Sequence, residues 1–140
     1  MKILVAADGS DFTKRMLAYI AAHDEWLGGR HDYTVLTVVP AIPPRAAAVL
    51  DHDLVQSYYA EEAEKVFAPV RTFFDKQGIK ATFEHKVGPA ADTIAKTADA
   101  GKFDLLVMGT HGHGILTGLV MGSTTTKVVA HCGVPVLLIR

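Results

Sequence analysis

Short apolar runs alternate with longer segments of helical periodicity along the whole chain, and this alternation constrains the fold more than any other feature. The apolar runs have the length of strands and cover Lys2–Ala7, Tyr33–Val39, Lys80–Val87, Phe103–Met108 and Val134–Ile139. A segment long enough for a helix separates each pair of runs, as the crossover between parallel strands requires. The pattern predicts one α/β domain over residues 1–140, an open sheet of five parallel strands with helices on both faces.

Local signals set the expected helix boundaries. The expected helices begin after Ser10 or Asp11, at about Asp53, at Gly88-Pro89 and at about Ser123, and they end at Gly28-Gly29, about Gln77, Gly101 and about His131. Pro69 is expected to kink or split the second of them. The proline-containing stretch Ala41–His52 is expected to be a mobile loop. Strand Lys80–Val87 is more polar and is expected at a sheet edge, whereas Phe103–Met108 is nearly all apolar and is expected to be central.

Charge and composition exclude several classes of protein. The formal net charge is −1, and no run of basic residues is longer than Lys14-Arg15. A nucleic-acid partner is therefore not expected. No apolar stretch approaches the ~20 residues of a membrane span, and the apolar N-terminal run is too short for a signal peptide. The single cysteine, Cys132, cannot form an internal disulfide. These features predict a cytoplasmic protein.

The loop after the fourth predicted strand combines glycines with hydroxyl side chains. Five glycines lie within it, at positions 109, 112, 114, 118 and 122, and Ser123, Thr124, Thr125 and Thr126 follow at the start of the last predicted helix. Parallel sheets bind ligands at the carboxyl ends of their strands. A glycine loop that leads into a helix can direct backbone N–H groups at a polyphosphate. The same residues also suit an ordinary turn and an N-cap, so the loop alone leaves both interpretations open.

The known phosphate motifs give no match. No segment ends in the Gly-Lys-Ser/Thr of a P-loop. The stretch Gly112-His113-Gly114 with Gly118 has one residue too many before its third glycine to be a dinucleotide fingerprint.

Three separated motifs, which together extend over the whole chain, resemble the ATP-binding branch of the universal stress protein family. They are the spacing Gly109-x2-Gly112-x9-Gly122-Ser123 within a loop that opens Val107-Met108-Gly109-Thr110-His111-Gly112, the N-terminal stretch Ile3–Ser10, and the C-terminal stretch Val134–Ile139. The resemblance implies a Rossmann-like, adenine nucleotide alpha-hydrolase-like sheet. It also implies an ATP site at the ends of the first, second and fourth strands, and a homodimer.

Carried over by position, the resemblance assigns roles to individual residues. Ala6, Ala7 and Asp8 would line the base and the ribose, and the Asp8 carboxylate would accept hydrogen bonds from the ribose hydroxyls. The backbone of Val38 would face the adenine edge, and Met108 and Gly109 would form the floor. The phosphates would be held by Gly112, Gly122, Ser123, Thr124 and Thr125, with His111 and His113 in the same loop. Mg²⁺ would enter with the triphosphate, because the loop offers it no carboxylate.

One position departs from the family pattern. The residue after Gly112 is usually basic in the family, and here it is His113. A neutral imidazole attracts phosphate less strongly, so we expect a lower or pH-sensitive affinity.

Several functions stay open at this point. The leading one is a regulatory stress-response protein for which ATP is a ligand, with slow or no hydrolysis, because no general base or transition-state Arg can be named beside the loop. Self-phosphorylation on Ser123 or a neighbouring threonine is a variant of it. The alternatives are an enzyme that transfers an adenylyl group and a dimeric interaction module that binds no nucleotide. The edge of Val134–Ile139 is the predicted dimer contact.

The other polar residues each have an ordinary structural interpretation beside a functional one. Asp8 could be a turn or cap residue, or the phospho-acceptor of a receiver domain, although no matching acidic cluster and lysine are found. His111 and His113 form a weak metal pair without acidic or cysteine partners. Cys132 is expected to be a buried small apolar residue rather than a nucleophile.

Overall fold

In the computed structural model, which describes residues 1–114 and 120–140, five parallel strands form one sheet. The strands are β1 (Lys2–Ala6), β2 (Asp32–Val39), β3 (Ala81–Val87), β4 (Leu105–Gly109) and β5 (Val136–Ile139). Their order across the sheet is β3-β2-β1-β4-β5, and every neighbouring pair is parallel. This confirms the predicted fold class. It also places β3 at an edge and β4 in the interior, as their polarity indicated.

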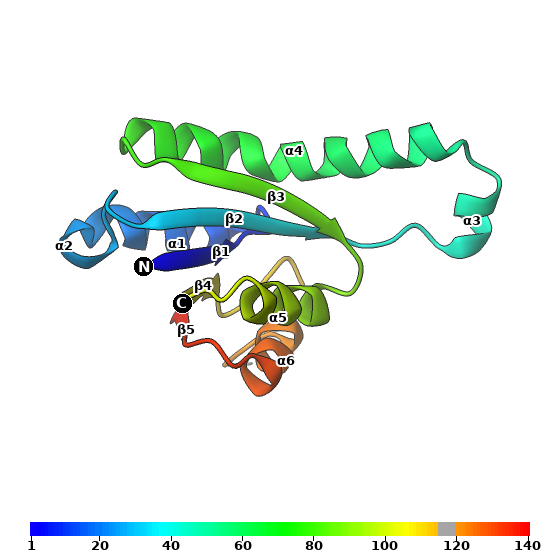
Figure 1. Ribbon diagram of the computed structural model, residues 1–140. Coiled ribbons are helices and arrows are strands. Elements are labelled where there is room, and N and C mark those ends of the chain that lie inside the picture. Colours follow the sequence, from blue (N-terminus) through cyan, green and yellow to red (C-terminus); the bar gives the residue numbers. More distant parts are fainter. Residues whose placement is uncertain (115–119) are drawn as a thin grey trace.

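Helices cover both faces of this sheet (Figure 1). Helices α1 (Asp11–Ala22), α2 (Asp24–Leu27) and α4 (His52–Lys76) lie on one face, and α5 (Ala90–Ala100) and α6 (Ser123–His131) lie on the other. The alternation of side chains along each strand divides the core accordingly. Ile3 and Val5 join the core under α1 and α4, whereas Leu4 joins the core under α5 and α6.

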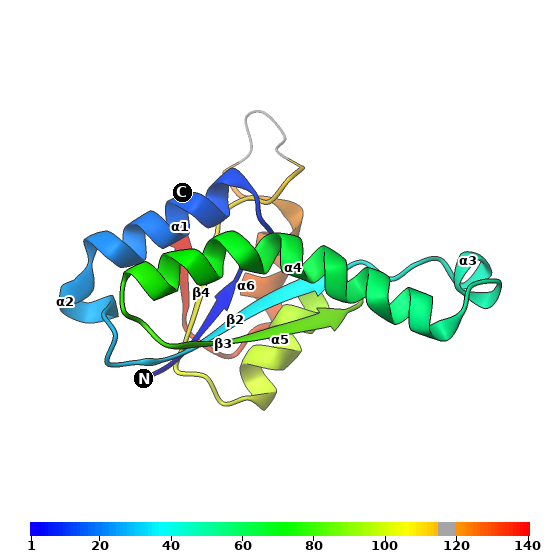
Figure 2. The ribbon, with the colours of Figure 1, turned by 90° about the horizontal axis from the view of Figure 1, so that it is seen from above.

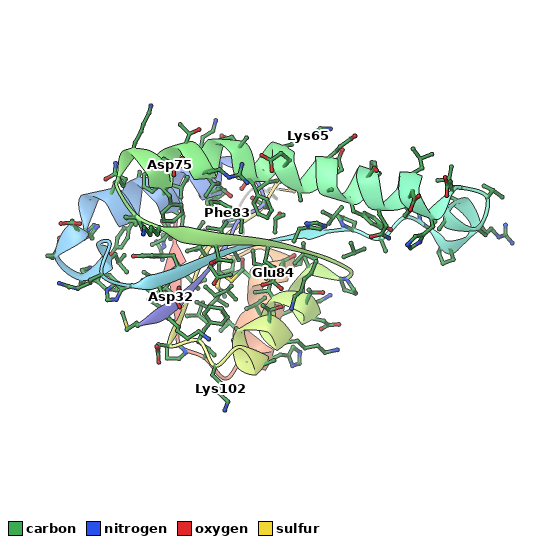
Figure 3. All side chains as sticks on the ribbon, turned by 45° about the horizontal axis from the view of Figure 1, so that its top comes forward. Asp32, Lys65, Asp75, Phe83, Glu84 and Lys102 are labelled. Carbon is green, nitrogen blue, oxygen red and sulfur yellow. The ribbon has the colours of Figure 1, made fainter. Side chains whose placement is uncertain are left out.

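The edge strand β3 shows the same division. Figure 3 shows Phe83 on the side of α4 and its neighbour Glu84 on the side of α5. The ring of Phe83 packs edge-on against that of Phe67, with 5.3 Å between centroids. The guanidinium of Arg71 lies 4.8 Å from the centroid of Phe83. Phe83 therefore packs against α4 at the edge of the sheet.

The expected end of the first helix and the expected loop 41–52 were wrong, and the split considered at Pro69 does not occur. The first helix is broken at His23, whose ring stacks on Tyr19 and whose Nδ1 donates to the Tyr19 carbonyl at 2.8 Å. The expected loop 41–52 contains a short helix, α3 (Pro44–Ala48), which Pro44 begins at a favoured first position. Helix α4 is not split, but continues through Pro69, where the side chain is exposed.

Part of α4 extends past the sheet. Figure 2 shows α3 and the N-terminal turns of α4 projecting beyond the ends of β2 and β3. Over the described residues, no helix combines the length and the apolar character that crossing a membrane demands.

Candidate functional site

A cavity of about 210 Å³ opens where the carboxyl ends of β1, β2 and β4 meet. Here β2 lies on one side of β1 and β4 on the other, so the strand order reverses, which is where such sheets bind ligands. All thirteen residues assigned to the site from the sequence line this cavity: Ala6, Ala7, Asp8, Val38, Met108, Gly109, His111, Gly112, His113, Gly122, Ser123, Thr124 and Thr125. The structure thus brings the predicted set together, while the binding role of each residue stays a prediction.

Asp8 is held by the turn that follows β1. Its Oδ1 accepts from the Ser10 N–H at 2.9 Å and from the Thr13 hydroxyl at 3.1 Å. The Thr13 oxygen in turn accepts from the N–H groups of Asp8 and Gly9 at 3.1 and 3.2 Å. These bonds are the turn role considered for Asp8, whereas the N-cap of α1 is Ser10. Because it uses Oδ1, the carboxylate keeps Oδ2 for a ligand.

Two positions of the loop require glycine because neighbouring atoms leave no space for a Cβ, and not because of the backbone conformation. A Cβ at Gly112 would lie 2.5 Å from Oδ2 of Asp8, and one at Gly109 would lie 2.7 Å from Cβ of Phe12. None of the glycines at 109, 112, 114 and 122 has a positive φ. Gly109 and Gly112 therefore allow the loop after β4 to approach Phe12 and the loop after β1 closely.

The N-terminus of α6 lies at the cavity. Gly122 is the N-cap, no side chain caps the helix, and the first helical bond runs from the Thr126 N–H to the Gly122 carbonyl at 3.0 Å. The N–H groups of Ser123, Thr124 and Thr125 precede that bond and have no helical acceptor. These amides and the helix dipole favour an anion at this end of the cavity.

The hydroxyls at the start of α6 divide into two kinds. Thr125 is 2% exposed and donates to the Gly109 carbonyl at 3.0 Å, and Thr126 donates to the Gly122 carbonyl at 2.9 Å. These two hydroxyls therefore donate to backbone carbonyls of the loop, and the phosphate role expected for this stretch stays a prediction. Ser123 and Thr124 line the cavity, and within residues 1–114 and 120–140 their hydroxyls make no such bond.

His113 joins the two loops across the cavity mouth. Its Nε2 lies 2.6 Å from the carbonyl oxygen of Asp8, and because a carbonyl only accepts, Nε2 carries the proton. His111 lies deeper, with Nδ1 3.0 Å from the Thr110 hydroxyl oxygen and its ring 5.0 Å from that of Phe12. The imidazoles therefore contact backbone and neighbouring side chains. No group of three or more metal-ligating side chains occurs in residues 1–114 and 120–140.

Val38 lies on β2 just beyond the point where the neighbouring strand β1 ends, because the β1–β2 pairing stops at Leu36. The Ala7 N–H donates to the Leu36 carbonyl at 2.9 Å, and the Gly88 N–H donates to the Val39 carbonyl at 3.1 Å. Backbone groups of successive strand residues point to alternate sides. The N–H and C=O of Val38 therefore point, like those of Leu36, toward β1 and the cavity.

Sequence reasoning missed six residues that also line the cavity: Phe12, Thr13, Leu36, Ala90, Ile94 and Gly114. Most belong to the first turns of α1 and α5. A helix that follows a parallel strand begins at the carboxyl edge of the sheet, so the first turn of every such helix is a candidate for the site. That positional signal could have found Phe12, Ala90 and Ile94.

The charge of the cavity is low. Asp8 is the one carboxylate, and no Lys or Arg is present, among the described residues that line it. Attraction for an anion must then come from backbone amides and the helix dipole rather than from side-chain cations.

Cys132 lies outside the cavity at the end of α6. Burial raises the pKa of its thiol, which donates weakly to the Val134 carbonyl.

The sequence profile of the universal stress protein family matches residues 1–140. The chain belongs to that family. This universal stress protein is 37% identical to one from Thermus aquaticus over 99% of its own length and 97% of the relative's. It is 32% identical to one from Synechocystis, again over 99% of its own length, but it spans only 42% of that relative.

Solved structures of similar fold agree with this membership. The protein MJ0577 superposes with a TM-score of 0.83 at 24% identity, over 99% of this universal stress protein and 94% of that chain. The UspA of Lactobacillus plantarum superposes with a TM-score of 0.78 at 26% identity, over 100% and 97% of the two chains. A family protein of Arabidopsis thaliana, solved with AMP bound, gives 0.70 at 20% identity, over 99% and 90%.

Proposed function

We propose that this universal stress protein binds ATP in the cavity at the ends of β1, β2 and β4, and that it acts as a nucleotide-dependent regulatory protein. The observation that carries the proposal is the geometry of one cavity. The N-terminal amides of α6, the fixed carboxylate of Asp8 and the backbone of Val38 lie on different walls of this cavity. The AMP bound to the Arabidopsis family protein supports an adenine nucleotide as the ligand class.

The base and the ribose would occupy the β1–β2 side. A backbone N–H and C=O, as Val38 presents, can pair with the ring nitrogen and the amino group of adenine. Oδ2 of Asp8 would accept a hydrogen bond from a ribose hydroxyl, because Oδ1 is already used within the turn. Ala6, Ala7 and Met108 would supply apolar contacts beneath the nucleoside.

The phosphates would lie over the N-terminus of α6. Gly112 and Gly122 leave space for them, the amides of residues 123–125 would donate, and the hydroxyls of Ser123 and Thr124 would add side-chain donors. Thr125 would contribute its N–H, because its hydroxyl donates to Gly109. The cavity volume of about 210 Å³ encloses part of such a ligand, so the terminal phosphates and a Mg²⁺ ion held by them would extend over the loop.

ATP would act mainly as a ligand, with hydrolysis slow or absent. Rapid phosphoryl transfer needs cations or donors around the γ-phosphate and a group that orients the attacking water. The described lining residues offer amides and hydroxyls but neither Lys nor Arg. Ser123 carries a hydroxyl at the N-terminus of α6, where the phosphates would lie. It is the candidate acceptor for slow self-phosphorylation.

The proposed assembly is a homodimer through the C-terminal strand. β5 is the last strand of the sheet, so one of its edges has no partner strand among the described residues. Two copies related by a two-fold axis could pair these edges over Val134–Ile139.

Two measurements test the proposed ligand. The nucleotide released on denaturing freshly purified protein identifies any resident ligand, and calorimetry with ATP, ADP and AMP in the presence of Mg²⁺ ranks their affinities. We expect saturable heat and a rise in Tm with adenine nucleotides. Absence of both heat and thermal protection with every one of them would overturn the proposal.

A further inference from the structure

An apolar groove lies on the part of the chain that projects beyond the sheet, far from the nucleotide cavity. We call this projecting part, residues 41–61, the arm; it contains α3 and the first turns of α4 (Figure 2). The groove has a volume of about 380 Å³ and is lined by Ile42, Leu50, Leu54, Val55, Ser57, Tyr58 and Glu61. The Tyr59 hydroxyl accepts from the Ile42 N–H at 2.9 Å and so fixes the connection from β2 against α4.

The arm exposes large apolar side chains in a regular pattern. Leu50 is 41%, Leu54 58% and Tyr58 44% exposed, and Val49 beside them is 83% exposed. Residues spaced by four share one face of a helix, so Leu54 and Tyr58 form a stripe that Leu50 extends just before the helix begins. The sheet does not reach under this part of α4, and the stripe therefore has no cover within the described chain.

We propose that a second copy of this chain covers the stripe, with the two arms antiparallel about a two-fold axis beside Leu54. A pattern of apolar residues at 50, 54 and 58 is symmetric about its centre. In the antiparallel arrangement Leu50 of one copy faces Tyr58 of the other, and each groove receives the partner's Leu54. Such an isologous contact uses the same patch twice.

The charges of the arm favour this occupant. Arg45 lies on α3 at the tip of the arm, and Glu61 lies at its base on the edge of the groove. Neither residue has an ion pair within residues 1–114 and 120–140, where Glu62 pairs with Lys65 and Glu64 with Arg71. Antiparallel arms bring the tip of each copy to the base of the other, and so bring opposite charges together at both ends of the stripe.

The acidic residues near the stripe also permit the pairing. In an antiparallel pair centred on Leu54, Asp51 and Asp53 lie level with Ser57 and Val55 of the partner. No two carboxylates are brought opposite each other along this segment. The contact is independent of the nucleotide cavity and uses a different part of the chain from β5.

The first test is the mass in solution. Sedimentation velocity of the full chain over a range of concentrations compares the wild type with Leu54→Asp and with the control Val129→Asp, an exposed apolar position on α6 outside the groove and the cavity. We expect Leu54→Asp to remove this association and lower the mass of the largest species, and Val129→Asp to leave that mass unchanged. An unchanged mass in Leu54→Asp would mean that the groove takes another protein or a small apolar ligand, and would overturn the proposal.

The second test examines the proposed orientation. Arg45→Glu or Glu61→Arg alone should weaken the association, and the double variant should restore it. In a Cys132→Ser background, Leu54→Cys should form a disulfide between two copies, whereas Val129→Cys should not. Failure of the double variant to restore association, or absence of the Leu54→Cys disulfide, would overturn the antiparallel arrangement.

Discussion

Gly112 lies against the carboxylate of Asp8 so closely that a Cβ at this glycine would come within 2.5 Å of Oδ2. The two residues belong to different loops, one after β1 and one after β4. His113 adds a bond between the same loops through the Asp8 carbonyl, at 2.6 Å. The shape of the cavity therefore depends on both loops at once.

Gly112→Ala should weaken nucleotide binding while the fold is kept. The added methyl must displace the Asp8 carboxylate or the loop, so we expect the Kd for ATP to rise about tenfold or more, equivalent to ~1.4 kcal/mol. Gly114→Ala is the matched control, because a Cβ there meets nothing within 4 Å. Calorimetry measures the two Kd values, and circular dichroism verifies the fold. Equal affinities of the two variants would contradict the role given to the Asp8–Gly112 contact.

Asp8→Asn should lose the ribose contact and keep the turn. The amide oxygen can still accept from Ser10 and Thr13, while the group in place of Oδ2 no longer accepts a ribose hydroxyl. We expect affinity for ATP to fall about tenfold, since hydrogen bonds to charged groups contribute ~1.5–3 kcal/mol. A dideoxy analogue without ribose hydroxyls should bind both proteins alike. If the variant weakened both ligands equally, Asp8 would act on the nucleotide in some other way.

Thr125→Val should destabilise the protein by about 0.5–1.5 kcal/mol. The substitution keeps the volume of a side chain that is 2% exposed, but removes the hydroxyl that holds the Gly109 carbonyl and leaves that carbonyl without its donor. Thr126→Val is the control, because its hydroxyl bonds within its own helix at an exposed position. Urea unfolding gives both free energies. Similar losses in the two variants would show that the Thr125 bond adds nothing beyond helix propensity.

Pro69→Ala should stabilise the protein. Pro69 is exposed within a continuous helix, where it removes one backbone hydrogen bond. A proline costs ~3 kcal/mol relative to alanine in a helix interior, offset by ~0.4–1 kcal/mol from the stiffer unfolded chain, so we expect a gain of about 2–2.5 kcal/mol. Thr72→Ala, on the same helix, restores no backbone donor and should change stability less. A loss of stability in Pro69→Ala would indicate that the proline has a packing role.

Tyr33→Phe should remove part of the alkaline sensitivity of the fold. Burial, reinforced by the charge of Asp24, raises the pKa of Tyr33 to about 12, and its hydroxyl donates to the Leu27 carbonyl. In the unfolded chain the pKa is about 10. Between these values the unfolded chain loses its proton first, so the free energy of unfolding falls as pH rises from about 10 to about 12.

The variant lacks that titrating group. At neutral pH it should be less stable than the wild type by about 1 kcal/mol, through the lost hydrogen bond. The difference should shrink above pH 10, and the tyrosinate absorbance that appears near pH 12 should be missing. Denaturant unfolding at several pH values and an absorbance titration measure the two effects. A constant difference at all pH values would contradict the assigned pKa.

Part of the fold could be read from local pattern and part could not. The five strands were predicted with boundaries close to those observed, because a buried strand and its flanking turn are local features. The break at His23 was missed, since apolar residues continue at helical spacing on both sides of it. Helix α3 was missed although Pro44 followed by Arg45 and three alanines is a favourable helix start.

The sequence by itself determined the fold class, the family and thirteen of the residues that line the cavity, because these depend on local periodicity or on the family resemblance carried by motifs at fixed spacing. Only the tertiary structure decided what those residues do to one another. It made the glycines necessary through contacts with Asp8 and Phe12, and it turned the Thr125 hydroxyl toward Gly109. These relations join loops that are far apart in the chain. They arise because parallel strands end at the same edge of the sheet, and a local pattern of residues does not show which loops meet there.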